Sequence, residues 1–268
     1  MERFIKSVFA ILIVLVSFNA ATASFISITT DIKGVAVDGN QGVSRLSVVN
    51  RGDEAAFDTS VSFHLQEGFT AEEVFIGRLD PNIPFETEIV VKTPAGALPG
   101  VYPAAASVNY RDANSYPFSA VTPFNIVNSR QTTTAIFAVL DEVSVSESRG
   151  AELKLTVKNP DPVDRNANVM LYLPRELEAE KYSKKLFLPA RGNAELEFEV
   201  SSFSALPGSS YAVFAAIGFE ENGMMHATFA RGTITIVEEQ PLVSNSALKA
   251  VLAVLVLIFL ALQFRRKG

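Results

Sequence analysis

The sequence predicts an all-β fold, and three observations support this. Apolar and polar residues alternate with a period of two in residues 85–92, 152–158 and 195–200, which is typical of strands with one wet face. Gly, Pro, Asn and Asp turns separate these runs at short intervals. A set of residues also recurs after about 109 positions, which indicates one module present twice. No sustained helical period occurs between residues 24 and 246.

The pattern predicts about seven strands in each copy, and this count and spacing are typical of two tandem immunoglobulin-like β-sandwiches. In the first copy we expect strands near residues 24–30, 43–50, 57–65, 73–79, 85–92, 101–110 and 116–127. In the second copy we expect them near residues 132–141, 151–158, 167–173, 182–188, 194–201, 210–219 and 225–237. Asn222-Gly223 predicts a tight turn before the last strand.

The repeat is clearest at two places. Leu46-Ser-Val-Val-Asn50 aligns with Leu155-Thr-Val-Lys-Asn159, and Leu98-Pro-Gly-Val-Tyr102 echoes Leu206-Pro-Gly-Ser-Ser-Tyr211. We expect each Tyr to turn its ring toward the core and to bond its hydroxyl to a loop carbonyl, as in the tyrosine corner of immunoglobulin-like sandwiches. In the same register Phe214 points away from the core. It then covers an interdomain or partner surface, or stands alone as an exposed aromatic.

The two ends predict export and anchoring. A basic start, nine apolar residues at 8–16 and an Ala-x-Ala site predict a signal peptide over residues 1–23, cleaved after Ala23. Residues 247–264 are long and apolar enough for a transmembrane helix, and the basic tail 265–268 predicts a cytoplasmic C-terminus. We therefore expect sandwiches at residues 24–128 and 129–239, a spacer at 240–246, and an ectodomain in the periplasm or on the cell surface. Retention or processing of the C-terminal helix is left open.

Composition excludes several classes of protein. The chain has no Cys and only two His, so disulfide scaffolds and Cys-ligated metal sites are excluded. The formal net charge is -6; the signal segment holds +1 and the tail +4, so residues 24–246 carry -11. An acidic body repels nucleic acid. Calcium and basic partners are open alternatives, while the simplest interpretation of the charge is solubility.

No catalytic, cofactor-binding or metal-binding residue is predicted. His64 and His226 alternate with core residues and belong to different copies, so we expect neither to act in catalysis or to ligate a metal. The polar turn at residues 161–166 lacks the spacing of a known calcium loop. Arg51-Gly52-Asp53 is a tripeptide that some adhesion ligands use, but its glycine is also explained by a turn.

The order of these motifs resembles the CARDB-type domain, the cell-adhesion-related domain of bacteria, and related domains of surface-layer-like proteins. The resemblance rests on Asn50-Arg-Gly52, Leu79-Asp-Pro81, Leu98-Pro-Gly-Val-Tyr102 and Val108-Asn-Tyr110. It covers most of residues 43–127 and, more weakly, 150–237. It implies an extracellular adhesive or spacer module and names no ligand.

We therefore expect a non-enzymatic, membrane-anchored envelope protein with no cofactor, which presents two immunoglobulin-like modules for adhesion or assembly with other envelope proteins. Addition of a partner strand to a free sheet edge is one expected mode of assembly. The alternative is an accessory protein that binds a polysaccharide or a membrane complex.

Overall fold

A computed structural model describes residues 24–238, which form strands and loops and contain no helix. The prediction of an all-β fold is confirmed. Within these residues, no helical segment has the length and apolar character needed to cross a bilayer. The predicted signal peptide, spacer, transmembrane helix and basic tail at residues 1–23, 240–246, 247–264 and 265–268 lie outside the described residues.

The first half of the chain forms nine strands around one hydrophobic core. They are β1 (Ile28–Ile32), β2 (Val35–Asp38), β3 (Gln41–Asn50), β4 (Ala56–His64), β5 (Thr70–Ala71), β6 (Val74–Leu79), β7 (Phe85–Lys92), β8 (Gly100–Arg111) and β9 (Pro117–Asn128). One sheet has the order β1-β3-β7-β5 and the other β6-β4-β8-β9-β2, and the pairing of β2 with β3 joins the two sheets at one edge. We call this half the first sandwich.

The second half forms another nine strands around a separate core. They are β10 (Phe137–Leu140), β11 (Glu142–Val145), β12 (Ala151–Lys158), β13 (Arg165–Tyr172), β14 (Leu177–Ala179), β15 (Ser183–Leu188), β16 (Asn193–Ser202), β17 (Ser210–Glu221) and β18 (Met224–Ile236). The sheets have the orders β10-β12-β16-β14 and β15-β13-β17-β18-β11. We call this half the second sandwich.

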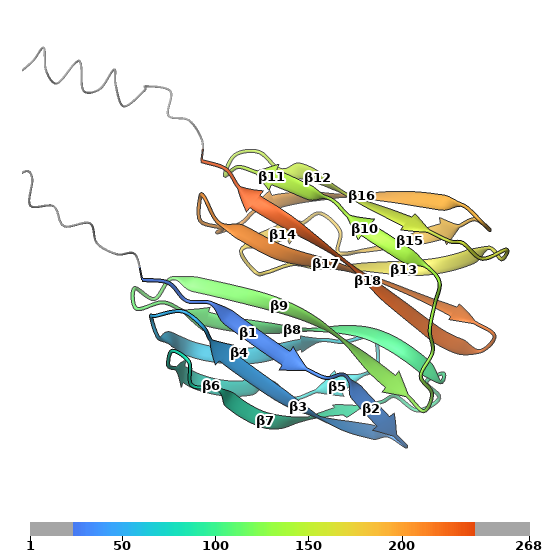
Figure 1. Ribbon diagram of the computed structural model, residues 1–268, viewed down its shortest axis with the longest axis horizontal. Helices are drawn as coiled ribbons and strands as arrows, with labels where there is room; N and C mark the ends of the chain where they lie inside the picture. Colours follow the sequence, from blue (N-terminus) through green and yellow to red (C-terminus); the bar gives the residue numbers. More distant parts are fainter. Residues whose placement is uncertain (1–23, 239–268) are drawn as a thin grey trace, which may run out of the picture.

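The four sheets stack as layers, and the two five-stranded sheets lie in the middle of the stack (Figure 1). The outer faces of these two middle sheets therefore meet, so β8 and β17 are covered on both sides and read as nearly continuous buried runs. The two described ends of the chain leave from the same end of the molecule (Figure 1).

Most strands lie within two or three residues of the predicted ranges, because alternation and turn residues mark them directly. The first strand of each half differs. The chain switches sheets after Ile32, where Gly34 has a φ of +82°, and again at Asp141, and the short strands β2 and β11 that follow lie beyond the predicted ranges 24–30 and 132–141. Strands β5 and β14 were not predicted, because two or three residues are too few to show a period.

Corresponding residues hold corresponding loops in the two halves. The Asn50 side chain accepts from the amide of Gly52 at 2.9 Å and donates to the carbonyl of Glu54 at 2.6 Å. Asn159 likewise accepts from the amide of Asp161 at 3.2 Å and donates to the carbonyl of Val163 at 2.8 Å. Each of these buried side-chain amides lies beneath a loop and makes hydrogen bonds to the backbone groups of that loop.

Candidate ligand-binding groove between the sandwiches

The two sandwiches meet through small side chains on the outer faces of β8 and β17. Ala105 and Ala216 are fully buried there, together with Val121 and Tyr172. Gly218 lies beside Pro103 at this boundary, and a Cβ at Gly218 would be in ordinary van der Waals contact with the proline ring, at 3.7 Å. Phe214 is half-buried against this cluster, so it covers the interdomain surface that was one of its two predicted roles. Small residues on an otherwise outward face allow the two sheets to pack closely.

A second contact joins the start of β8 to the start of β18. Met225 pairs with Gly100 in parallel register, and the amide of Met225 donates to the carbonyl of Pro99 at 2.8 Å. Gly100 has a φ of +133°, and a Cβ there would lie 2.2 Å from the Met225 carbonyl oxygen. Only glycine fits both the backbone conformation and the approach. The hydroxyl of Thr132, in the linker, also donates to the Met225 carbonyl at 2.6 Å.

A third contact is a buried carboxylate. Glu176 of the second sandwich is 0% exposed, and its two oxygens accept from the amide and hydroxyl of Ser119 on β9 at 2.7 and 2.6 Å. The hydroxyl of Ser119 in turn accepts from the amide of Arg175 at 2.8 Å. Burial raises the pKa of Glu176, and the two bonds from Ser119 partly offset that rise. These contacts fix the two sandwiches to each other, so surfaces formed by both are preorganised.

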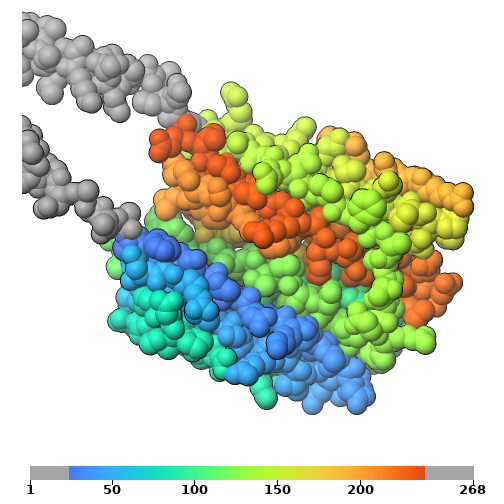
Figure 2. All heavy atoms as spheres, viewed as in Figure 1, coloured from blue at the N-terminus to red at the C-terminus, as the bar shows by residue number. Residues whose placement is uncertain are grey.

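The segment around Glu176 divides the boundary between the sandwiches into two depressions. The first, which we call the terminal cleft, has a volume of about 560 Å³ and lies near Ser24, Tyr110 and Tyr211. Figure 2 shows the surface hollowed there, between the blue and green residues of the first sandwich and the orange residues of the second. The second, which we call the aromatic groove, has a volume of about 440 Å³ and is also lined by both sandwiches.

Polar groups of the chain itself occupy much of the terminal cleft. The Glu54 carboxylate accepts from the hydroxyl of Ser24 at 2.8 Å and from the amide of Ala113 at 3.0 Å. Tyr110 stacks on Phe118, with ring centroids 5.7 Å apart, and is buried. The charged and aromatic groups of this cleft are therefore engaged in holding the fold, and few remain for a ligand.

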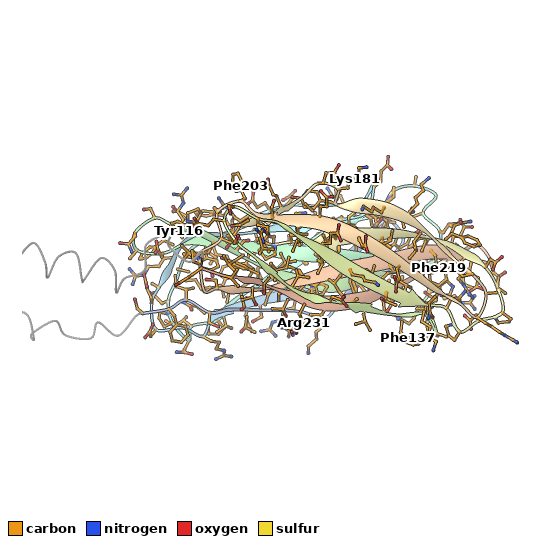
Figure 3. All side chains as sticks on the ribbon, turned by 90° about the horizontal axis from the view of Figure 1, so that it is seen from above. Tyr116, Phe137, Lys181, Phe203, Phe219 and Arg231 are labelled. Carbon is orange, nitrogen blue, oxygen red and sulfur yellow. The ribbon has the colours of Figure 1, made fainter. Side chains whose placement is uncertain are left out.

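The aromatic groove offers more free groups. Its floor comes from the outer face of β4 and β8, with Ser62, His64 and Asn109, and its wall comes from the second sandwich. On that wall, Tyr182 and Phe203 expose 47% and 72% of their surface. Figure 3 shows Phe203 at the edge of the molecule, on the side opposite to Phe137 and Arg231. The site thus combines exposed aromatic faces with hydrogen-bonding side chains.

The structure does not bring His64 and His226 into one site. The His64 ring lies 6.2 Å from the ring of Tyr172, and desolvation by the surrounding protein lowers the pKa of His64. The His226 ring stacks on Phe219 at 5.2 Å, and its Nδ1 lies 2.9 Å from the carbonyl oxygen of Thr133. Among residues 24–238, no group of three or more His, Asp or Glu side chains is placed to hold a metal ion.

The polar turn at residues 161–166 surrounds the positively charged side chain of Arg165. The guanidinium of Arg165 is buried and lies 3.0 Å from the Asp161 carboxylate and 2.6 Å from that of Glu221. The Asp164 carboxylate accepts from the amide of Ala190 at 2.7 Å. Both aspartates therefore already have partners, and a structural role explains the turn.

Arg51-Gly52-Asp53 is packed against the N-terminal segment. The Asp53 carboxylate accepts from the amide of Phe25 at 2.7 Å, and a Cβ on Gly52 would lie 2.0 Å from the Phe25 carbonyl oxygen. The glycine is therefore needed for close approach of two chain segments. The turn interpretation of this tripeptide accounts for its contacts.

Sequence reasoning missed the residues of the aromatic groove. Phe203 lies in a connection, and Tyr182, which was predicted to begin the strand at 182–188, lies just before β15. Both meet Asn109 only through the packing of the two halves. One signal was present. The outward positions of β8 carry small side chains, Ala105 and Ser107, where a solvated face usually carries long charged ones.

Comparison with known proteins finds one family. Residues 36–111 match the model of the NPCBM-associated NEW3 domain of alpha-galactosidase. The match covers most of the first sandwich and less than half of the chain. The CARDB resemblance is not confirmed, and no catalytic family is indicated for this chain. No curated protein matches the sequence.

The solved structures that match the chain do so with low TM-scores and low sequence identity. The E. coli chaperone DraB has a TM-score of 0.30 and 8% identity, over 39% of this chain and 56% of that one, so the chain spans little more than half its length. The periplasmic chaperone SfaE has a TM-score of 0.28 and 14% identity, over 78% and 100%. Salmonella alpha-2-macroglobulin has a TM-score of 0.33 and 13% identity, over 81% and 16%. These values support no statement about ligands.

Proposed function

We propose that this protein is a non-enzymatic, membrane-anchored envelope protein, and that its two sandwiches form one rigid unit outside the membrane that binds a polysaccharide. The observation that carries the proposal is the match of residues 36–111 to a domain associated with a glycosidase. Because the matched domain is an accessory part of a carbohydrate-processing enzyme, the match favours a role in binding carbohydrate. The rigid boundary between the sandwiches favours binding at a preformed surface.

Location and binding are tested separately. Protease shaving of intact cells and of cells with a permeabilised envelope, followed by an antibody against residues 24–238, reports whether the sandwiches reach the exterior. For binding, the full chain in a detergent without a sugar headgroup is mixed with insoluble polysaccharide from the envelope of the same cells. We expect the protein to sediment with the polysaccharide, and free protein at all polysaccharide concentrations would contradict the proposal.

Assembly with other envelope proteins is the second candidate. Exposed aromatics on edge strands favour it, since Phe75 on β6 and Phe187 on β15 are 74% and 57% exposed. The edges themselves are poor templates for an added strand. Gly77 gives β6 a left-handed residue, with a φ of +79°, and Lys184 and Lys185 lie on β15. Cross-linking on intact cells that captures one defined protein partner, in place of polysaccharide, would favour this candidate.

A further inference from the structure

We propose that the aromatic groove is the polysaccharide-binding site and that it takes an uncharged segment of the sugar chain. This inference rests on the proposed function and adds a site and a ligand class to it. The groove lies between the two sandwiches, with its floor on β4 and β8. Its wall is formed by β14, by the segments just before β14 and β15, and by the residue that follows β16.

The two aromatic side chains of the groove are suited to the apolar faces of sugar rings. Phe203 and Tyr182 are 72% and 47% exposed, and both belong to the groove wall. Covering a water-exposed aromatic ring with an apolar surface is favourable, because it removes apolar surface from contact with water. A sugar ring has such a surface in its C–H groups, while its hydroxyls remain free to bond to the floor.

The floor supplies uncharged hydrogen-bonding groups. The Asn109 amide nitrogen donates to the Ser62 hydroxyl oxygen at 3.3 Å, and its side-chain oxygen accepts no hydrogen bond from residues 24–238. The imidazole nitrogens of His64 also have no hydrogen-bond partner in this range. Because its pKa is lowered, the imidazole is neutral near pH 7 and offers one donor and one acceptor. Hydroxyl groups bond to both kinds of atom.

The charges of the groove are balanced. Arg175 and Glu178 both line it, one of each sign, and the Glu178 carboxylate accepts from the Ser201 hydroxyl at 3.1 Å. A polyanion would meet one guanidinium and one carboxylate, with little net attraction. This distribution favours an uncharged sugar segment over an acidic polysaccharide, a nucleic acid or an anionic lipid surface.

The groove is held in place by the same residue that joins the sandwiches. The amide of Phe203 donates to the backbone carbonyl of Glu176 at 2.9 Å, while the Glu176 side chain is fixed to Ser119. The backbone of Tyr182 is fixed as well, since its carbonyl accepts from the amide of Leu171 at 2.7 Å. A preformed site loses little conformational entropy on binding.

The test compares alanine variants in the groove with a matched exposed aromatic elsewhere. The probes are the neutral and acidic fractions of the envelope polysaccharide, and the protein is the full chain in a detergent without a sugar headgroup. We expect Phe203→Ala and Tyr182→Ala to weaken binding of the neutral fraction at least tenfold. Phe137→Ala, which removes a ring that is 52% exposed on β10, should leave binding unchanged.

A second readout excludes loss of folding as the cause. The chain has no Trp, so Phe203→Trp introduces the only tryptophan, whose emission can be excited selectively over that of the tyrosines, while keeping an aromatic face. Its emission should shift to shorter wavelength when the neutral fraction is added, and binding should persist. Phe137→Trp should show no shift.

The outcomes separate the site from the function. If the wild-type chain binds neither fraction, the proposed function and the site both fail. If it binds the neutral fraction but the groove variants bind equally well and Phe203→Trp shows no shift, the site is wrong and the function stands. Binding of the acidic fraction alone would overturn the ligand class.

Discussion

The Leu-Pro-Gly corners of the two sandwiches share a sequence but differ in what they contact. In the first sandwich, Gly100 lies against Met225, and a Cβ there would overlap its carbonyl. In the second sandwich, a Cβ at Gly208 would meet nothing within 4 Å. Both glycines have a positive φ, +133° and +82°. The motif therefore serves a local turn in both halves, and in the first half it has acquired a second task as a docking point.

The tyrosines that follow differ as well. The Tyr102 hydroxyl donates to the carbonyl of Leu98 at 2.8 Å, as predicted from the sequence. The Tyr211 hydroxyl instead accepts from the amide of Leu206 at 3.4 Å, so its predicted carbonyl partner was wrong. The second copy has one more residue between the Leu-Pro-Gly corner and the tyrosine than the first copy has, so a different backbone group lies next to the phenolic oxygen of Tyr211. Burial raises the pKa of both hydroxyls.

The largest expected effect separates the two glycines. Gly100→Ala should destabilise the protein by about 3 kcal/mol or more, because the backbone conformation is strained for alanine and the side chain overlaps Met225. Gly208→Ala should cost only about 1 kcal/mol of left-handed strain. Urea unfolding measures both, and small-angle scattering should show separated sandwiches in Gly100→Ala alone. Equal losses in the two variants would show that the first corner is not a docking point.

A second experiment tests what the halves share. Asn50→Ala and Asn159→Ala should each cost about 3 kcal/mol, because each removes hydrogen bonds to buried loop groups. Urea unfolding followed by segment-resolved hydrogen exchange would show which half loses protection. We expect loss in the first sandwich for Asn50→Ala and in the second for Asn159→Ala. The same half weakening in both variants would contradict the assigned equivalence.

The boundary between the halves should respond to pH through Glu176. Because burial raises its pKa in the folded chain, folded Glu176 binds a proton more readily than unfolded Glu176. The stability of wild type relative to Glu176→Gln should therefore fall as pH rises from about 4.5, the ordinary glutamate pKa, through the raised value. Urea midpoints of both proteins between pH 4 and 8 measure this. A relative stability that rises with pH would mean that the bonds from Ser119 outweigh burial.

The smallest effect distinguishes the two tyrosines. Tyr102→Phe should cost about 1 kcal/mol, near the low end for a lost hydrogen bond, since the Leu98 carbonyl keeps a bond from the Asn128 amide at 2.9 Å. Tyr211→Phe should cost about 0.5 kcal/mol because its bond is longer. Thermal unfolding resolves the difference if both variants are measured together. A larger loss for Tyr211→Phe would reverse the ranking of the corners.

The strands were predictable because each half-buried strand carries its own period, and Tyr102 was placed in the core by the turn before it. The packing of one half on the other was not. The outward-facing Phe214 on β17 and the small outward side chains of β8 hint that these faces are covered, but neither strand indicates which surface covers it. Glu176 shows the limit most clearly. A glutamate after Leu-Pro-Arg is normally solvated, and its burial depends on Ser119, 57 residues earlier in the chain.

The close packing of small side chains between the sandwiches also bears on the order of synthesis. The first sandwich is synthesised before the second, so its contact face is exposed to water until the second sandwich has folded. That face carries the small residues Ala105, Ser107 and Ser119, with Val121 beside them. A partly synthesised chain therefore exposes little apolar surface that could bind other unfolded chains. The contact face is covered only when the β17–β18 hairpin brings Met225 to Gly100.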